Sequence, residues 1–222
     1  MVKRNSVNDV QVSNKLSIYP KTQKQKEYIE ALNNHNQVFA IGPAGSGKTY
    51  IPTMMAVKAY LRGEISKIIL TRPAVAVEEE HGFLPGTLEK KLAPWVIPVT
   101  EIIEEALGSK QRFLDILKSG DLEIAPFAYM RGRTFKNAFV FLDEAQNTTP
   151  KQMEMFLTRL GEDARVVISG DIKQTDMKHG SGLTRAIDLV RKFDIPAAIV
   201  EFTAKDVVRS DLCQMWVEAF DS

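Results

Sequence analysis

The sequence contains one cysteine and three histidines, and these shortages exclude several kinds of site. Because Cys213 is the single cysteine in 222 residues, no internal disulfide and no cysteine-cluster metal site can form. His35, His81 and His179 are scattered, with no spacing that places two of them on one helical face, so we expect no zinc site. Cys213 lies in an apolar, helix-like context, and we assign it a packing role.

The sequence also lacks a long apolar run and an excess of charge of one sign. No stretch approaches the roughly 20 apolar residues that span a bilayer, and the N-terminus lacks the apolar core of a signal peptide. We therefore expect a cytoplasmic protein without a membrane partner. The formal net charge is +1, which by itself demands no polyanionic partner.

Short apolar segments alternate with helical ones along most of the chain, which predicts an α/β fold. Such alternation indicates a mostly parallel sheet with helices on both faces. We expect a flexible arm over residues 1–18 and one domain over 19–222, while the Pro- and Gly-rich residues 78–98 resist assignment. The expected strands are 38–41, 67–73, 122–127, 138–143, 165–171 and 196–202, and the expected helices are 22–34, 49–63, 99–118 with a break at Gly108, 150–160, 182–193 and 210–220.

The residues GPAGSGKT, at positions 42–49, have the spacing of a phosphate-binding loop. Glycines allow backbone N–H groups to turn toward phosphate oxygens, and the setting between an apolar strand and a helix favours this interpretation over a plain glycine-rich turn. Lys48 would reach the terminal phosphates, and the Thr49 hydroxyl would bind magnesium. The candidate nucleotide-contacting residues here are Gly42, Pro43, Ala44, Gly45, Ser46, Gly47, Lys48, Thr49 and Tyr50.

Two further strands end in polar residues that suit hydrolysis. AFVFLDEAQ places Asp143 where it would hold the magnesium shell and leaves Glu144 to orient or deprotonate water. Taken alone, these acids are also explained as solvated residues that close a strand. RVVISGDIKQTD ends in Asp171 and Gln174, of which Gln174 is a candidate sensor of the terminal phosphate. The alternative is a βα turn capped by the aspartate.

The motifs GPAGSGKT, LTRPAV, GFLPG, RGRTF, DEAQNTT, LTRLG and SGDIKQTD together resemble the PhoH family, the phosphate-starvation-inducible ATPases related to superfamily 1 helicases. The resemblance runs from about Tyr19 to Trp216, and the chain is similar to the short PhoH-like proteins of phages and bacteria. It implies a single RecA-like P-loop NTPase domain that uses ATP and Mg²⁺. It also implies a homohexameric ring, action on RNA, and a location in the bacterial or host cytoplasm.

The resemblance also gives roles to individual residues. It implies that Gln25 recognises adenine and that Gln174 senses phosphate, beside the phosphate, magnesium and water roles of Lys48, Thr49, Asp143 and Glu144. For Gln25 an alternative stays open, because Thr22 and Gln25 have the spacing of a helix capping box. Pro52 departs from the family pattern, and a proline requires that the helix begin just before it.

Hydrolysis also calls for an arginine that neutralises charge developing on the γ-phosphate, so in this chain either hydrolysis is very slow or the arginine comes from a neighbouring subunit. Superfamily 1 helicases supply it from a second RecA-like domain, and this chain is too short to hold two. Arg209 in FTAKDVVRSDL resembles the family's arginine finger and would act on a neighbouring subunit of a ring. The alternative is a solvated or helix-capping arginine, and Lys205 is a weaker candidate for the same task.

Three arginines are candidates for contacting single-stranded nucleic acid. Arg72 follows a strand, and Arg131 and Arg133 flank a glycine with Tyr129 and Phe135 nearby. Guanidinium groups beside aromatic rings suit phosphates and stacked bases. Arg72 has a rival role as a ligand of the nucleotide or of an adjacent carboxylate, and both aromatic residues are also explained as core.

Two functional hypotheses follow from the sequence. The first is a ring-forming, magnesium-dependent ATPase that binds or remodels single-stranded RNA or DNA, and it leaves strand-unwinding activity open. The second is an ATP-regulated protein-assembly switch without nucleic-acid activity. Nucleic acid should stimulate hydrolysis under the first hypothesis and leave it unchanged under the second.

Overall fold

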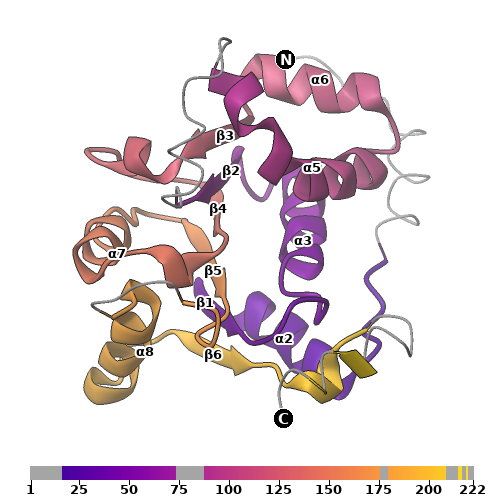
Figure 1. Ribbon diagram of the computed structural model, residues 1–222. Helices are drawn as coiled ribbons and strands as arrows, with labels where there is room; N and C mark the ends of the chain where they lie inside the picture. Colours follow the sequence, from indigo (N-terminus) through magenta and orange to yellow (C-terminus); the bar gives the residue numbers. More distant parts are fainter. Residues whose placement is uncertain (1–16, 74–87, 176–179, 209–214, 217–218, 220–222) are drawn as a thin grey trace.

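The computed structural model describes residues 17–73, 88–175, 180–208, 215–216 and 219, and its centre is one parallel sheet (Figure 1). The sheet has six strands in the order β3-β2-β4-β5-β1-β6, and every pairing between them is parallel. The strands are β1 Gln37–Ile41, β2 Lys67–Arg72, β3 Leu122–Pro126, β4 Ala138–Leu142, β5 Arg165–Gly170 and β6 Ala198–Glu201.

Helices cover both faces of this sheet. On one side lie α2 (Gln23–Asn34), α3 (Tyr50–Leu61), α5 (Leu88–Leu107) and α6 (Lys110–Ser119), and on the other lie α7 (Pro150–Leu157) and α8 (Gly182–Phe193) (Figure 1). Three short 3₁₀ helices complete the described elements, η1 (Phe127–Met130), η2 (Ala145–Asn147) and η3 (Ala204–Asp206). The predicted α/β class is confirmed. Among the described helices, none is long and apolar enough to cross a membrane.

The strands divide their side chains between two hydrophobic clusters. In β1, Val38 and Ala40 pack with α2 and α3, whereas Phe39 and Ile41 pack with α7 and α8. Successive side chains of a strand point to opposite faces, so a strand covered on both sides must be apolar throughout. This explains why the predicted strands are continuous apolar runs rather than alternating ones.

Helix α5 occupies part of the segment that the sequence left unassigned. It begins at Leu88 and continues through Pro94 and Pro98, although a proline inside a helix removes a hydrogen bond. Val99 and Ile103 are buried against the sheet, and this packing favours a helix where local propensity does not. The predicted break at Gly108 is confirmed, because this residue has a φ of 68° and α6 begins at Lys110.

Most other predicted elements differ from the structure by a few residues at their ends. Helix α8 has the predicted bounds, while α7 ends at Leu157, short of the predicted end at residue 160. Residues 210–220, the predicted last helix, lie mostly outside the described residues, and only 215, 216 and 219 are described as helical.

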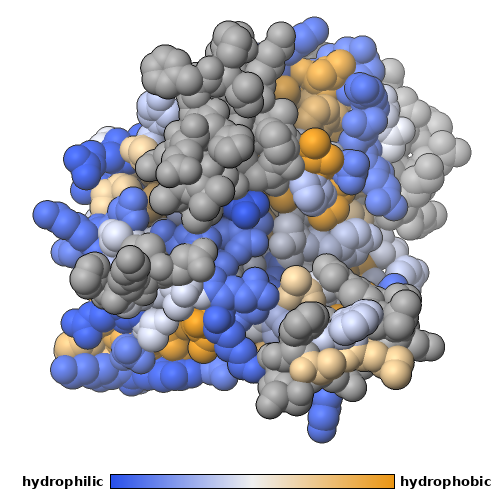
Figure 2. Space-filling model, viewed as in Figure 1, coloured by the Kyte–Doolittle hydropathy of each residue, from blue (hydrophilic) through white to orange (hydrophobic). Residues whose placement is uncertain are grey.

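Figure 2 shows one face of the molecule as mainly hydrophilic, with its hydrophobic side chains in separate patches.

Candidate nucleotide-binding site

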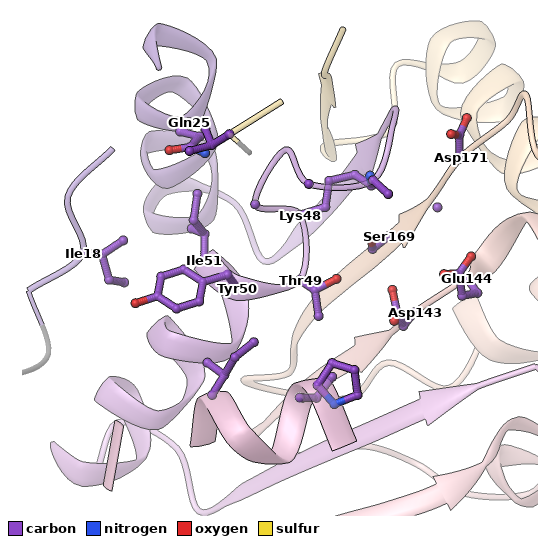
Figure 3. A pocket seen from close by; sticks show the side chains of 18 of the residues that line it. Ile18, Gln25, Lys48, Thr49, Tyr50, Ile51, Asp143, Glu144, Ser169 and Asp171 are labelled. Atoms are coloured by element: carbon purple, nitrogen blue, oxygen red, sulfur yellow. The ribbon is translucent and has the colours of Figure 1, made fainter. Parts of the chain in front are cut away.

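A cavity of about 780 Å³ lies at the carboxyl ends of the central strands (Figure 3). In an open parallel sheet, ligands bind at this edge. Residues from separate segments meet there because β4, β5 and β1 are neighbours in the sheet. The wall includes Lys48 and Thr49 after β1, Arg72 at the end of β2, Asp143 and Glu144 after β4, and Ser169, Gly170, Asp171 and Gln174 at the end of β5.

The phosphate loop, residues 42–49, needs its glycines for packing as well as for ligand approach. Gly42 has a φ of 133°, and a Cβ atom there would lie 2.3 Å from the carbonyl oxygen of Phe202. Gly47 has a φ of 92°, and its Cβ would lie 3.0 Å from Nε2 of Gln25. Residues other than glycine rarely adopt these backbone conformations. The loop is therefore confined by the chain after β6 and by α2.

Lys48 is held inside this loop by backbone oxygens. Its Nζ donates hydrogen bonds of 2.6 Å to the carbonyl oxygens of Gly42 and of Pro43. Ser46 Oγ donates to the same Pro43 oxygen at 3.0 Å, which closes the turn. The ammonium group is thereby fixed at the cavity wall, where it can meet a phosphate with little loss of side-chain entropy.

Pro52 fits the structure because another residue supplies the hydrogen bond that it lacks. Helix α3 begins at Tyr50, so Pro52 lies in the first turn as expected. A residue with an N–H at position 52 would donate to the carbonyl of Lys48 in an α-helix. The buried Tyr28 hydroxyl of α2 donates to that carbonyl instead, at 3.2 Å. Burial raises the pKa of Tyr28 well above its usual value, so the hydroxyl keeps its proton.

Gln25 supports the phosphate loop directly. Its Nε2 donates to the Ser46 carbonyl at 3.0 Å, and its Oε1 accepts from the N–H of Lys21 at 2.8 Å. Thr22 Oγ1 accepts from the Gln25 N–H at 3.1 Å, so one half of the expected capping box is formed. The second half takes the N–H of Lys21 rather than that of Thr22. Gln25 also lines the cavity, and its adenine role stays a prediction.

The two acids after β4 differ in their surroundings. Burial, followed by the charge of Glu144, raises the pKa of Asp143 to about 6. The Glu144 carboxylate faces Arg72, whose Nη2 lies 3.9 Å from Oε1. Figure 3 shows the Thr49 hydroxyl and the Asp143 carboxylate directed into the same part of the cavity. The Asp143 and Glu144 carboxylates and the Thr49 hydroxyl offer oxygen donors of the kind that bind Mg²⁺.

Gln146 was not among the predicted site residues, although it is the fourth residue of DEAQ. It is 2% exposed, and its Nε2 donates to Glu144 Oε2 at 2.5 Å. Its Oε1 accepts from the N–H of Asp171 at 3.1 Å. The amide therefore joins the ends of β4 and β5. The sequence offered one sign of this role, the position of a polar residue two places after the predicted water-positioning acid.

The segment after β5 combines both interpretations given above. Asp171 Oδ1 accepts from the N–H of Lys173 at 3.0 Å, and the N–H of Gln174 donates to the Asp171 carbonyl at 3.1 Å. These bonds make the capped turn. Gln174 also lies in the cavity wall, together with Asp171. The structure therefore brings the candidate sensor to the same cavity as Lys48 and Asp143, and its sensing role stays a prediction.

The candidate nucleic-acid residues separate in the structure. Arg72 lies in the cavity wall, and its contact with Glu144 agrees with the carboxylate alternative. Arg133 forms a two-point ion pair with Glu123, with Nη2 2.8 Å from Oε2, and its guanidinium lies 5.6 Å from the ring of Phe135. Arg131 is exposed at the end of η1. Neither Arg131 nor Arg133 lines the cavity.

The proposed finger, Arg209, lies outside the described residues. The residue before it, Val208, lines the cavity, and its N–H donates to the Gly45 carbonyl at 2.9 Å. Lys205 is exposed in η3. Ser17 and Ile18, which we expected in the N-terminal arm, line the cavity beside Tyr19. Segments far apart in the sequence, Ser17 to Tyr19 and Val208, therefore line the same cavity as the phosphate loop.

A phosphate loop between a buried strand and a helix, with paired acids at the end of a second parallel strand, defines a P-loop NTPase domain. Comparison with known families agrees with this class. The profile of the PhoH family, described as PhoH-like protein, matches residues 17–221. The chain belongs to this family, and the membership predicted from its motifs is confirmed.

Several relatives have similar sequences. The PhoH-like protein of Bacillus subtilis (strain 168) is 47% identical over 207 residues, which cover 92% of this chain and 64% of that protein. Protein PhoH of Escherichia coli (strain K12) is 44% identical over 206 residues, which cover 91% of this chain and 58% of that protein. The matched part of the chain thus spans only 58–64% of the length of these relatives.

Solved structures with a similar arrangement include two helicases. The UvsW helicase from bacteriophage T4 has a TM-score of 0.49 at 12% identity, and the match covers 84% of this chain and 60% of the UvsW chain. The Pif1 helicase from Candida albicans has a TM-score of 0.45 at 12% identity, and the match covers 92% of this chain and 44% of the Pif1 chain.

Proposed function

We propose that the protein is a magnesium-dependent ATPase that assembles into a homohexameric ring and couples hydrolysis to single-stranded RNA or DNA. The observation that carries the ATPase part is the convergence of Lys48, Thr49, Asp143, Glu144 and Gln174 on one cavity. These residues come from three loops at the ends of β1, β4 and β5. Their chemistry covers phosphate binding, metal binding and water activation, which are the parts that phosphoryl transfer needs.

Each residue has a distinct task in this proposal. Lys48 and the N–H groups of the phosphate loop bind the β- and γ-phosphates, while Thr49 and Asp143 hold Mg²⁺. When bound, the ion would neutralise charge that develops on the phosphates. Glu144 orients the attacking water and takes up its proton, and Gln174 contacts the γ-phosphate. Lys48, Arg72 and the loop dipoles favour an anion in this cavity.

The far end of the cavity suits a nucleobase. Ile18, Tyr50 and Ile102 are among the residues that line the cavity, and Figure 3 shows Ile18 and Tyr50 on the side away from Glu144 and Asp171. A planar base can stack on the tyrosine ring and remove apolar surface from water. Gln25, at the same end, would read the base edge by exchanging one of its present hydrogen bonds. The adenine role of Gln25 remains part of the proposal in this form.

The ring is proposed because the γ-phosphate needs another cation in the transition state. We assign this task to Arg209 of a neighbouring copy, in a head-to-tail contact that closes. A mixing experiment tests the assignment. Lys48→Ala and Arg209→Ala variants should each be inactive alone, and an equal mixture should regain activity at about a quarter of its sites. No recovery after exchange of subunits would overturn the shared site.

Coupling to nucleic acid rests on the family resemblance and on three arginines, Arg72 at the end of β2 and Arg131 and Arg133 after β3. Phosphate release per subunit should rise with protein concentration and rise again when single-stranded RNA or DNA is added. Lys48→Ala controls for contaminating ATPases. A rate that neither nucleic acid changes would overturn the coupling while leaving the ATPase in place.

A protein-assembly switch is the second candidate, and two observations favour it. Arg133 is already paired with Glu123, and the formal net charge is only +1, so the attraction for a polyanion is weak. Under this alternative, ATP and Mg²⁺ alone should change the assembly state measured by light scattering. The same change should occur with and without nucleic acid.

A further inference from the structure

We propose that Gln146 is a positioning residue that sets the carboxylate of Glu144 and links it to the phosphate-side loop after β5. This inference rests on the proposed ATPase function and adds a residue to it. Gln146 does not line the cavity, so any effect on the reaction must pass through a neighbour. Two neighbours are available, one at each end of its side-chain amide.

Glu144 needs such support because its own backbone gives it little. Its φ of 51° lies in the left-handed region between β4 and η2, so it belongs to no regular element. Its two carboxylate oxygens have different partners. Oε1 lies 3.9 Å from Arg72 Nη2, a loose contact, and Oε2 accepts the 2.5 Å bond from Gln146. The orientation of the carboxylate is therefore set mainly by Gln146.

Gln146 can do this because its amide has one usable orientation. Its Oε1 accepts from the Asp171 N–H and its Nε2 donates to Glu144, so a flipped amide would meet a donor with a donor and an acceptor with an acceptor. The side chain is buried. Gly170 leaves room for it, since a Cβ there would lie 2.6 Å from Oε1. A carboxylate or a hydrocarbon at position 146 would lose one bond or both.

The same bonds connect Glu144 to the candidate phosphate sensor. Asp171, Lys173 and Gln174 form one hydrogen-bonded turn, and Thr175 Oγ1 donates to the Gln146 carbonyl at 3.3 Å. A displacement of this turn therefore moves both the side chain and the backbone of Gln146. Contact between Gln174 and the terminal phosphate is thus relayed to the water-positioning acid. The relay is expected to govern kcat rather than nucleotide binding.

The first test removes the donor and keeps the acceptor. Gln146→Glu keeps an acceptor for the Asp171 N–H, removes the donor to Glu144 and adds a repelling charge. We expect kcat to fall about tenfold to a hundredfold, the effect of a misplaced catalytic group. KM for ATP and the Kd of a non-hydrolysable ATP analogue with Mg²⁺ should change less than about threefold, because the phosphate loop is untouched.

The matched control is Gln152→Glu. Gln152 is an exposed glutamine whose Oε1 accepts from the Thr149 N–H in the capping box of α7, a bond that glutamate also makes. This control should leave kcat and KM unchanged. Gln146→Asn is a second variant, for the case that buried charge prevents folding. It keeps the amide but is one methylene too short for both partners, and the same loss of kcat is expected.

A double-mutant cycle separates positioning from a purely structural role. In a Glu144→Gln background, which is already slow, Gln146→Asn should lower the rate less than about twofold, because the carboxylate that Gln146 positions is no longer there. An equal loss in both backgrounds would overturn the proposal, as would a wild-type kcat in both Gln146 variants. Absence of hydrolysis by the wild-type protein would overturn the ATPase function itself, which distinguishes the two failures.

Discussion

The phosphate loop and the acid loop, residues 143–147, face the same cavity but are held in shape by different means. Backbone geometry shapes the phosphate loop, where Gly42, Gly45 and Gly47 all have positive φ. Side-chain bonds shape the acid loop, where Gln146 of η2 donates to the Glu144 carboxylate and Arg72 at the end of β2 lies 3.9 Å from it. A loop shaped by its backbone shows itself in glycine spacing. A loop shaped by side chains depends on partners that are distant in the sequence.

Loss of the lysine should have the largest effect on the phosphate loop. Lys48→Ala removes the ammonium that we propose to contact the terminal phosphates, so hydrolysis should fall on the order of 10³-fold and nucleotide affinity should fall with it. Phosphate release and analogue binding are measured together. Lys58→Ala, on α3 and away from the cavity wall, is the control. Full activity of Lys48→Ala would remove the site assignment.

The acid loop should respond differently to the loss of its carboxylate. Glu144→Gln keeps the size of the side chain but cannot take up a proton, so hydrolysis should fall roughly a hundredfold. Affinity for ATP with Mg²⁺ should stay within about threefold, because Asp143 and Thr49 are unchanged. Equal losses of affinity for ATP in Glu144→Gln and Lys48→Ala would contradict the expected difference between the two loops. Single-turnover rates and analogue binding decide between these outcomes.

Stability should also distinguish backbone-shaped positions from ordinary turns. Gly42→Ala places a Cβ 2.3 Å from Phe202 at a φ of 133°, so unfolding free energy should fall by about 3 kcal/mol. Gly63→Ala has a φ of 72° and no atom within 4 Å of the added Cβ, so about 1 kcal/mol is expected. Urea unfolding measures both. Equal losses would show that the contact with Phe202 yields easily.

The smallest expected effect concerns the support of the phosphate loop by α2. Gln25→Ala removes the bond to the Ser46 carbonyl, and KM for ATP should rise about fivefold, the equivalent of one hydrogen bond. Thr22→Ala removes the cap of the same helix and should cost about 1 kcal/mol of stability with an unchanged KM. If both variants change stability alone, Gln25 is only a helix-end residue.

Much of the fold was predictable from the sequence because the strands are buried on both faces and read as apolar runs. The helix after the phosphate loop was also placed correctly, since Pro52 restricts where it can begin. Helix α5 was missed at its start because Pro94 and Pro98 argue against a helix locally, while burial of Val99 and Ile103 favours one. Tertiary packing decided that segment.

The site was predictable where a short motif, GPAGSGKT or DEAQ, carries the residues concerned. The motif spacing placed Lys48, Thr49, Asp143 and Glu144 in one cavity, and the structure brings them together. The hydrogen bond from the Tyr28 hydroxyl to the Lys48 carbonyl joins residues 20 positions apart, and the bond from the Asp171 N–H to Gln146 Oε1 joins residues 25 apart. Neither pair has a local pattern, so only the folded chain reveals them.

The position of β5 between β1 and β4 has a geometric consequence for the whole site. Neighbouring strands lie about 4.8 Å apart, so one intervening strand separates the phosphate loop from the acids by roughly 10 Å. That width accommodates the end of a triphosphate, an ion and a water molecule. The gap is therefore set by backbone pairing and not by the length of any side chain. Substitutions around the cavity can change its chemistry while its dimensions stay constant.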